Sequence, residues 1–205
     1  MTRIRTIPSF QSLPCRIAVI SDTHTSTHFR DFHPSLLARL KDTPPDLILH
    51  AGDITLPESL VVLANMAPTF AVRGNRDILG FSDLPDVIQL QVGSHRIQLA
   101  HGHGPLFHYL FDKLKYILDG YRFERYRAYL ESIQPKSDIH IFGHTHVPVS
   151  RWIDGKLFFN PGTAGYPARA YPHSTLGWIT IQKDGSIQAN IQYLDRSEGL
   201  FPEFG

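Results

Sequence analysis

The N-terminal half of the chain alternates short apolar runs with segments of helical periodicity. The apolar runs lie at 16–20, 46–50 and 69–73, and each is bounded by turn residues and has the length of a buried strand. Between them, 34–41 and 57–67 begin with proline and carry apolar residues at helical spacing. Strands and helices in alternation predict parallel strand pairing with right-handed crossovers.

The C-terminal half consists instead of paired apolar segments around short turn motifs. Gly-Ser, Asp-Gly and Lys-Asp-Gly separate the two members of each pair, which predicts three β-hairpins. The pairs are 86–92 with 95–100, 147–153 with 156–160, and 175–182 with 186–193. Parallel strands in the N-terminal half followed by antiparallel pairs in the C-terminal half predict an α/β fold. We expect a four-layer α-β-β-α sandwich of two mixed sheets flanked by helices.

Length and composition fit an ordinary globular protein. The 205 residues suffice for one sizeable core, and we expect a single domain over 1–205 with a helical insertion at about 105–135. A net charge of +1 gives no overall field that would recruit nucleic acid or an anionic membrane. Cys15 is the only cysteine, which excludes an intrachain disulfide. No segment resembles a signal peptide or a membrane span, so the cytoplasm is the expected location.

Five apolar runs are followed directly by side chains that bind metals. The motifs are SDTH, AGD, RGNRD, AHGH and GHTH. Ligands of open α/β sheets bind beyond the carboxyl ends of strands, so these side chains are expected to converge on one rim. One such motif could be an ordinary turn, but five junctions of one kind favour a metal site. The candidate ligands are Asp22, His24, Asp53, Asn75, His101, His144 and His146.

The spacing and the types of these side chains suggest what they hold. His144 and His146 stand two positions apart after the apolar run 138–142, and in a strand such residues point to the same face, so both could reach one centre. Carboxylate, amide and imidazole without thiolate suit Mn²⁺, Fe²⁺ or Zn²⁺. Seven ligands exceed the four of a structural zinc site and suit two ions about 3.5–4 Å apart that share a carboxylate. Such a pair is typical of phosphate-ester hydrolysis.

The ordered motifs D-x-H, G-D, G-N-x-D, H-G-H and G-H-x-H resemble the calcineurin-like metallophosphoesterase superfamily, from about residue 15 to 193. HGH and NPGT look most like its small bacterial phosphodiesterase branch, to which the retromer subunit of vacuolar sorting is also similar. The resemblance implies a two-sheet sandwich and a metal-activated water as nucleophile. It also implies a first metal on Asp22, His24 and His146, a second on Asn75, His101 and His144, and Asp53 as the bridge. We expect two divalent ions, Mn²⁺ first, with Fe²⁺, Zn²⁺ or Ni²⁺ as alternatives.

Three residues beside the ligand motifs are catalytic candidates. GNRD departs from the superfamily pattern GNH, whose histidine is commonly credited with protonating the leaving group. Arg76 cannot do this, but its planar donors suit a phosphate, so we expect it to clamp substrate or else to pair with Asp77. His103, one step beyond His101 on the same side, is the candidate for the vacant acid role or for orienting a neighbouring group.

The insertion at 105–135 carries its own helical pattern. Apolar residues at spacings of three and four over 107–118 predict an amphipathic helix, Gly120 ends it, and 123–133 predicts another. Its tyrosines, lysines and arginines exceed what a covering helix needs, which favours a lid or a homodimer contact. Nucleic-acid binding is the less favoured alternative, because acidic residues dilute the basic patch.

The expected function is therefore hydrolysis of phosphodiester bonds in a small phosphate-ester substrate by a dinuclear metal site. A phosphomonoesterase or pyrophosphohydrolase with the same site is one alternative. A non-catalytic protein-binding scaffold on the same fold is another, but a scaffold has no need of seven metal ligands.

Overall fold

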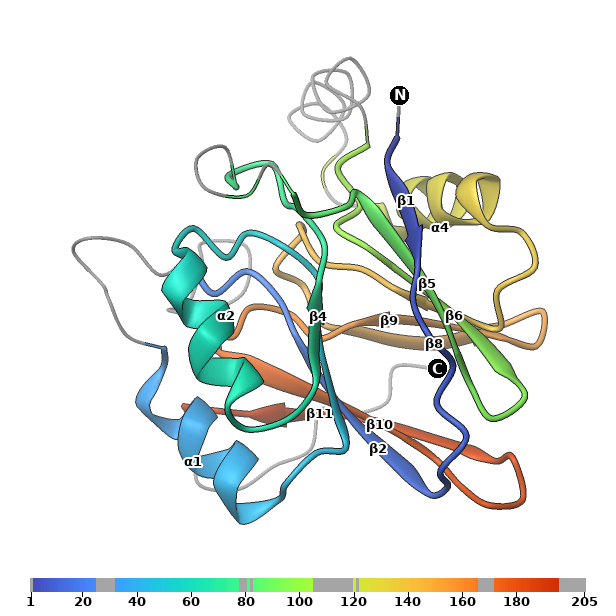
Figure 1. Cartoon of the computed structure of the whole chain (residues 1–205). Helices are drawn as coiled ribbons and strands as arrows, with labels where there is room; N and C mark the ends of the chain where they lie inside the picture. Colours follow the sequence, from blue (N-terminus) through green and yellow to red (C-terminus); the bar gives the residue numbers. More distant parts are fainter. Residues whose placement is uncertain are drawn as a thin grey trace.

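Two β-sheets packed face to face form the centre of the molecule in the computed structural model (Figure 1). The structure describes residues 2–24, 32–77, 81, 83–104, 120, 122–165 and 172–195. One sheet has the strand order β1-β5-β6-β7-β9-β8 and the other β11-β10-β2-β3-β4. The strands are β1 (Ile4–Thr6), β2 (Cys15–Ile20), β3 (Leu47–His50), β4 (Thr69–Ala71), β5 (Val87–Val92), β6 (His95–Ala100), β7 (Ile139–Ile141), β8 (Val149–Ile153), β9 (Lys156–Asn160), β10 (Thr175–Ile181) and β11 (Ile187–Tyr193).

The pairing of the strands follows the two halves of the sequence pattern. β2, β3 and β4 are parallel, as the alternation of strands and helices predicts. The three predicted hairpins are the antiparallel pairs β5–β6, β8–β9 and β10–β11. β1 was not predicted from sequence: its three residues are all exposed, so it has no apolar run to mark it. Both sheets are mixed, as expected.

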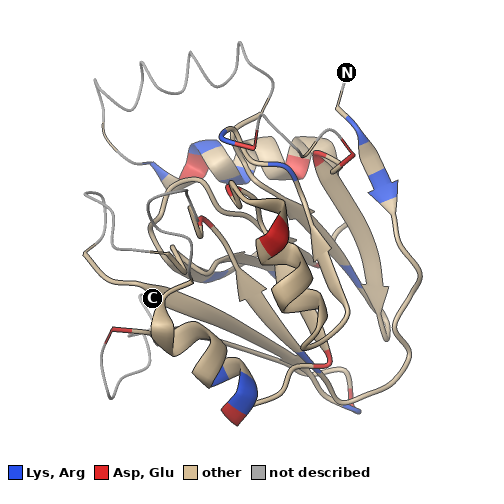
Figure 2. Cartoon of the chain, turned by 60° about the vertical axis from the view of Figure 1, so that its left-hand side comes forward, with Lys and Arg blue, Asp and Glu red and all other residues tan. Residues whose placement is uncertain are grey.

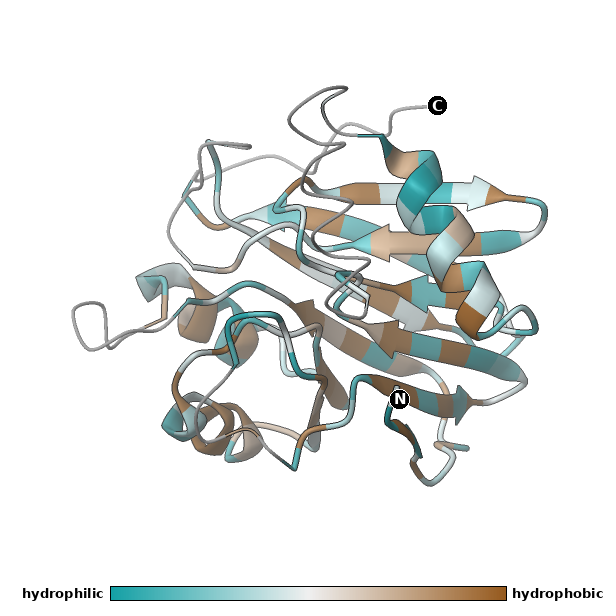
Figure 3. Cartoon of the chain, turned by 90° about the horizontal axis from the view of Figure 1, so that it is seen from above, coloured by the Kyte–Doolittle hydropathy of each residue, from teal (hydrophilic) through white to brown (hydrophobic). Residues whose placement is uncertain are grey.

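Helices cover the outer faces of the sandwich, and Figure 3 shows hydrophobic residues concentrated on the strands and on parts of the helices. α1 (Pro34–Asp42) and α2 (Pro57–Ala64) begin with the predicted prolines, and their buried leucines pack against β2 and β3. α4 (Phe123–Ile133) packs against the other sheet through an apolar cluster. The four-layer prediction is confirmed, whereas the helix predicted over 107–118 lies outside the described residues.

α4 carries charges of both signs (Figure 2). Arg127 forms ion pairs with Glu131 on the same helix and with Asp154 on the β8–β9 turn. This arginine is therefore engaged within the chain, which gives no support to the nucleic-acid alternative. Among the described helices, none combines the length and hydrophobicity needed to cross a lipid bilayer.

A buried polar pair interrupts the apolar layer beneath α4. The imidazole of His140 on β7 is fully buried, stacks on Phe158 with ring centroids 4.8 Å apart, and has Nδ1 3.0 Å from Oε1 of Gln98. Burial, assisted by the ammonium of Lys156, lowers the pKa of His140 from 6.5 to about 4, although the carboxylates of Glu131 and Asp138 oppose this shift. The folded protein therefore holds His140 neutral.

We expect the free energy of unfolding to fall as pH is lowered from about 6.5 to about 4, and His140→Gln to make this fall shallower. Over this range the unfolded chain binds a proton at His140 that the folded protein does not bind. Urea unfolding at a series of pH values measures the slope in each protein. Equal slopes in the wild type and in His140→Gln would contradict the prediction.

Candidate metal centre

The predicted ligands lie in loops at the carboxyl ends of strands, and most of them have left-handed backbone. φ lies between 47° and 70° at Asp22, His24, Asp53, His144 and His146. This conformation is costly for residues other than glycine and clusters where function fixes a side-chain direction. Elsewhere in the described chain only two non-glycine residues, Thr55 and Asp154, share it. The strain is thus concentrated at the predicted metal site.

The expected strand geometry of His144 and His146 is wrong. β7 ends at Ile141, and left-handed φ at both histidines turns the chain between them, so the two rings diverge. Nδ1 of His144 lies 2.9 Å from Oδ1 of Asn75, whereas Nε2 of His146 lies 3.1 Å from Nε2 of His24. The two imidazoles therefore face two different groups of ligands.

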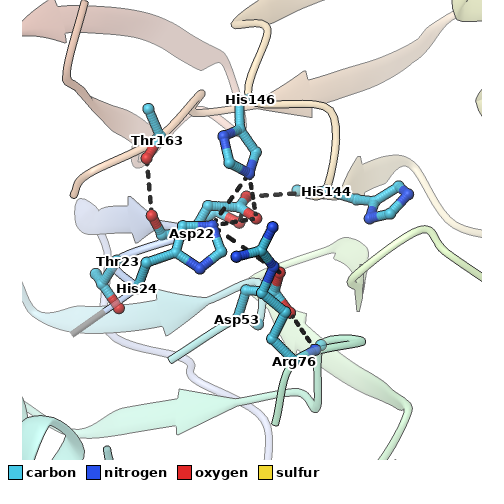
Figure 4. Close-up of polar contacts among 12 residues, drawn as sticks. Asp22, Thr23, His24, Asp53, Arg76, His144, His146 and Thr163 are labelled. Atoms are coloured by element: carbon cyan, nitrogen blue, oxygen red, sulfur yellow. Dashed lines mark hydrogen bonds and ion pairs between the residues drawn. The ribbon is translucent and has the colours of Figure 1, made fainter. Parts of the chain in front are cut away.

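The first group contains Asp22, His24 and His146 (Figure 4). Oδ1 of Asp22 lies 3.8 Å from Nε2 of His24 and 3.2 Å from Nε2 of His146. Asp22 is fully buried, and within the described residues no donor is in hydrogen-bond geometry with Oδ1. A buried carboxylate oxygen that lacks a donor and faces two imidazole nitrogens fits a cation.

The second group contains Asn75, His101 and His144. Oδ1 of Asn75 lies 3.0 Å from Nε2 of His101 and close to Nδ1 of His144. Nδ1 of His101 lies 2.6 Å from the carbonyl oxygen of Ala51, which can only accept, so Nδ1 carries the proton of the neutral ring. Nε2 of His101 therefore presents a lone pair to the site, as metal-binding histidines do.

Asp53 lies between the two groups. Its Oδ2 is 4.0 Å from Nε2 of His24, and its Oδ1 is 3.5 Å from Nε2 of His101. Oδ1 also accepts a hydrogen bond of 2.8 Å from the backbone N–H of Arg76. Burial raises the pKa of Asp53, and the nearby carboxylate of Asp22 adds to this effect although His101 opposes it. A cation beside Asp53 would relieve this crowding of negative charge.

Burial keeps two imidazoles of the site in the neutral form, in which one ring nitrogen has a lone pair for a metal. Burial lowers the pKa of His24 to about 4 and that of His144 to about 3, so both rings are neutral at pH 7. Burial alone would raise the pKa of Asp22, but the surrounding imidazoles, with His146 foremost, outweigh it and lower this pKa. Burial also lowers the pKa of His146, but the carboxylate of Asp22 outweighs it, and this pKa is raised.

His103 and Arg76 border the cluster. The ring of His103 is centred 5.2 Å from that of His101, and burial, followed by His101, lowers its pKa to about 3. A neutral His103 at pH 7 fits the orienting alternative better than the acid role. Arg76 is 64% exposed, and its Nε lies 3.9 Å from Oδ2 of Asp53. The carboxylate beside the guanidinium of Arg76 is therefore that of Asp53 and not that of the expected partner, Asp77.

Asp77 is a brace between loops. Its Oδ1 accepts from the backbone N–H groups of Ile54 and Thr55, and its Oδ2 from that of Gly74, each at 2.8 Å. The side chain is buried and committed to these three donors, so the structure gives no support to the catalytic role expected for it. Asp77 instead ties the loop after β3, which carries Asp53, to the loop after β4, which carries Asn75.

The NPGT motif was noted in the sequence, but the roles of two of its side chains, which hold the candidate-ligand loops in place, were not predicted. Asn160 donates through Nδ2 to the carbonyl oxygen of Gly143 and to Oγ1 of Thr145, on either side of His144. Thr163 donates through Oγ1 to the carbonyl oxygen of Asp22 at 2.7 Å (Figure 4). The position of NPGT in the sequence could have indicated these roles. The motif begins at the last residue of β9, and the metal-ligand motifs also follow the ends of strands.

Two glycines permit close approach of these loops. A Cβ at Gly74 would overlap the backbone N and Oδ1 of Asp53, and a Cβ at Gly143 would overlap Oγ of Ser21. The loops after β4 and β7 can therefore contact the two buried carboxylates only because these positions lack side chains.

Comparison with known proteins places this geometry in a family. The model of the calcineurin-like phosphoesterase superfamily domain matches residues 15–184. The chain belongs to the calcineurin-like phosphoesterase superfamily. A protein of Methanothermobacter thermautotrophicus named "Probable metallophosphoesterase" is 30% identical over 160 residues, which cover 76% of this chain and 81% of the relative. Two sets of side chains lie close enough to hold a metal ion, namely Asp22, His24 and His146, and Asp22, Asp53 and His101. Together with membership in this superfamily they indicate that the chain binds divalent metal.

Solved structures share the fold of this phosphoesterase. Vacuolar protein sorting 29 from Cryptosporidium parvum has a TM-score of 0.66 at 20% identity, over 89% of this chain and 98% of that one. A structure described as a novel archaeal phosphodiesterase has a TM-score of 0.58 at 20% identity, over 86% of this chain and 99% of that one. At these identities the likeness shows the fold alone.

Asp77→Ala should lower the free energy of unfolding by roughly 3 kcal/mol or more, because it leaves three backbone donors without their charged acceptor. Urea unfolding measures the loss. Asp184→Ala is the matched control, since Asp184 also accepts a backbone N–H, from Ser186, but at an exposed turn. A loss in Asp77→Ala no greater than in Asp184→Ala would show that the brace does not stabilise the loops.

Proposed function

We propose that this phosphoesterase is a dinuclear metal-dependent enzyme that hydrolyses phosphodiesters. The observation that carries the proposal is the position of Asp53, with one carboxylate oxygen toward His101 and the other toward His24. A carboxylate shared between two sets of nitrogen and oxygen ligands is the arrangement that holds two cations close together. The structure described as an archaeal phosphodiesterase, which shares the fold, supports the choice of diesters.

The two groups of ligands would hold one ion each. Asp22, His24 and His146 would bind the first, Asn75, His101 and His144 the second, and Asp53 both. Mn²⁺ is the expected ion, with Fe²⁺, Zn²⁺ or Ni²⁺ as alternatives, because the donors are oxygen and imidazole nitrogen without thiolate. Bound ions supply an activated water and neutralise charge on the phosphoryl oxygens.

The chain's own residues would bind and orient the ester. The guanidinium of Arg76 is exposed beside Asp53, and its planar donors match two phosphate oxygens. Its backbone N–H holds Oδ1 of Asp53, so one residue fixes the bridging carboxylate and presents a cation to the substrate. His103 lies beside His101 and would orient the groups around it.

A protein-binding scaffold is the second candidate, because Vacuolar protein sorting 29 of Cryptosporidium parvum has the same fold. The two candidate metal-ligand groups share the buried carboxylate of Asp22, whose Oδ1 lacks a donor among the described residues, and this favours the enzyme. Strained backbone at five candidate-ligand positions is typical of a functional site, which also favours the enzyme.

The purified protein with Mn²⁺ should hydrolyse bis-p-nitrophenyl phosphate faster than p-nitrophenyl phosphate, and Asp53→Asn should lose both this activity and both ions. An amide carries no charge, so it cannot hold two cations close together. Elemental analysis and release of p-nitrophenol measure the two effects. Asp184→Asn, in the exposed β10–β11 turn, is the control and should keep both properties.

Three results would contradict the proposal. Two tightly held ions in Asp53→Asn would exclude this carboxylate as the bridge, and a wild type that never binds more than one ion would exclude the dinuclear site. Faster turnover of the monoester would favour the phosphomonoesterase alternative.

His103→Ala should slow esters with alkyl and with p-nitrophenyl leaving groups by the same factor, because at pH 7 His103 is not in the imidazolium form that acts as a general acid. A general acid would instead contribute roughly 10²- to 10⁴-fold on the alkyl ester alone. Arg76→Ala should raise KM for both esters equally through lost phosphate contacts. Steady-state kinetics at verified metal content measure these ratios, and a selective loss on the alkyl ester in His103→Ala would restore the acid role.

A further inference from the structure

His50, the last residue of β3, is fully buried and belongs to neither group of ligands. Its Nδ1 lies 3.1 Å from the backbone N of Gly52, and its Nε2 lies 3.2 Å from Oγ1 of Thr23. The N–H of Gly52 can only donate, so Nδ1 accepts and the proton of the neutral ring lies on Nε2. Nε2–H then donates to the hydroxyl of Thr23, which in turn donates to the carbonyl oxygen of Ile54 at 3.5 Å.

Both hydrogen bonds of His50 end at residues adjacent to predicted ligands. Thr23 stands between Asp22 and His24, and its side chain points away from theirs (Figure 4). Gly52 directly precedes Asp53. The imidazole therefore joins the loop that carries the first two ligands to the loop that carries the bridging carboxylate.

Two backbone hydrogen bonds also join these loops, from the N–H of Asp22 to the oxygen of Gly52 at 3.0 Å and from that of His24 to the oxygen of Asp53 at 3.1 Å. Both of these bonds are made by the backbone, so they leave the side chain of Thr23 to make a separate contact. Because Thr23 points away from the ligands, its bond to His50 adds a restraint on the side of the loop opposite to them. Asp22 and His24 on either side of Thr23 have left-handed φ values of 52° and 47°, a costly conformation that persists only where the surrounding structure restrains it.

We propose that His50 is a positioning residue that, through Thr23 and Gly52, sets the orientation of Asp22 and His24 relative to Asp53. The inference rests on the proposed function only in that these three residues hold metal. Groups that orient metal ligands in this way typically affect metal affinity by about 10- to 100-fold. His50 does not contact substrate or metal itself.

Cobalt binding tests this role without any assay of hydrolysis, because Co²⁺ affinity and the visible spectrum of bound Co²⁺ both report ligand geometry. Thr23→Val removes the hydroxyl at nearly constant shape, and His50→Asn retains an acceptor for Gly52 but cannot reach Thr23. Each should weaken Co²⁺ binding about 10-fold or more and shift the visible bands. Thr23→Ser keeps the hydroxyl and should behave as the wild type.

Two comparisons separate positioning from general destabilisation. The double variant His50→Asn with Thr23→Val should bind Co²⁺ no more weakly than the worse single variant, because both changes break the same bond. His140→Asn alters another fully buried histidine, on β7 beneath α4, and should lower the melting temperature while leaving Co²⁺ affinity and spectrum unchanged.

Wild-type affinity and spectrum in Thr23→Val and His50→Asn would overturn the proposal, and so would an equal loss of affinity in His140→Asn. A wild type that binds Co²⁺ tightly but hydrolyses none of the tested esters would overturn the proposed function, while weaker binding in the variants would still support the role of His50. A wild type that binds no Co²⁺ would overturn both.

Discussion

The carboxylate of Asp22 is the point at which the two sheets are joined chemically. Asp22 follows β2 in one sheet, yet its Oδ2 accepts from the backbone N–H of His144, which follows β7 in the other, and from Oγ of Ser21. Its carbonyl oxygen accepts from Thr163, which follows β9. Loops from both sheets therefore meet at one buried residue, and only Oδ1 is left to face the imidazoles of the site.

Backbone strain is concentrated at the candidate ligands, whereas the stabilising contacts lie elsewhere in the fold. A left-handed residue other than glycine costs roughly 1–2 kcal/mol, and five ligand positions adopt this conformation. The apolar cluster between the sheets, drawn from both of them, opposes this cost. Side-chain braces such as Asp77 and Asn160 hold the loops by bonding to backbone groups, so the ligand side chains remain available.

The sequence predicted those parts of the fold that depend on local pattern. β2, β3 and the hairpins were predictable because their inward faces are apolar, and α1 and α2 because proline begins each helix. β1 was not, since an exposed edge strand of three residues leaves no hydrophobic signal. The candidate ligands were predictable as a set because strand ends converge on one rim.

The partners of individual side chains could not be predicted in this way. The strand-like reading of His144 and His146 was wrong because left-handed backbone removes the two-residue alternation on which it depended. Asp77 accepts from a backbone N–H of the loop after β3, and His50 reaches the side chain of Thr23 in the loop after β2. No local pattern in the sequence distinguishes these residues from a catalytic carboxylate and an ordinary core histidine. Such roles follow from three-dimensional hydrogen bonding alone.

Because the rim is assembled from both sheets, the concentration of free metal ion also affects how stable the folded chain is. Asp22 and His144 are separated by 122 positions in the sequence, so an unfolded chain cannot present these candidate ligands together. An ion that binds only the folded form adds about 2.7 kcal/mol to its stability when the free ion is at 100 times its dissociation constant. Under the proposed function, chelation would therefore make the protein more susceptible to proteolysis as well as inactive.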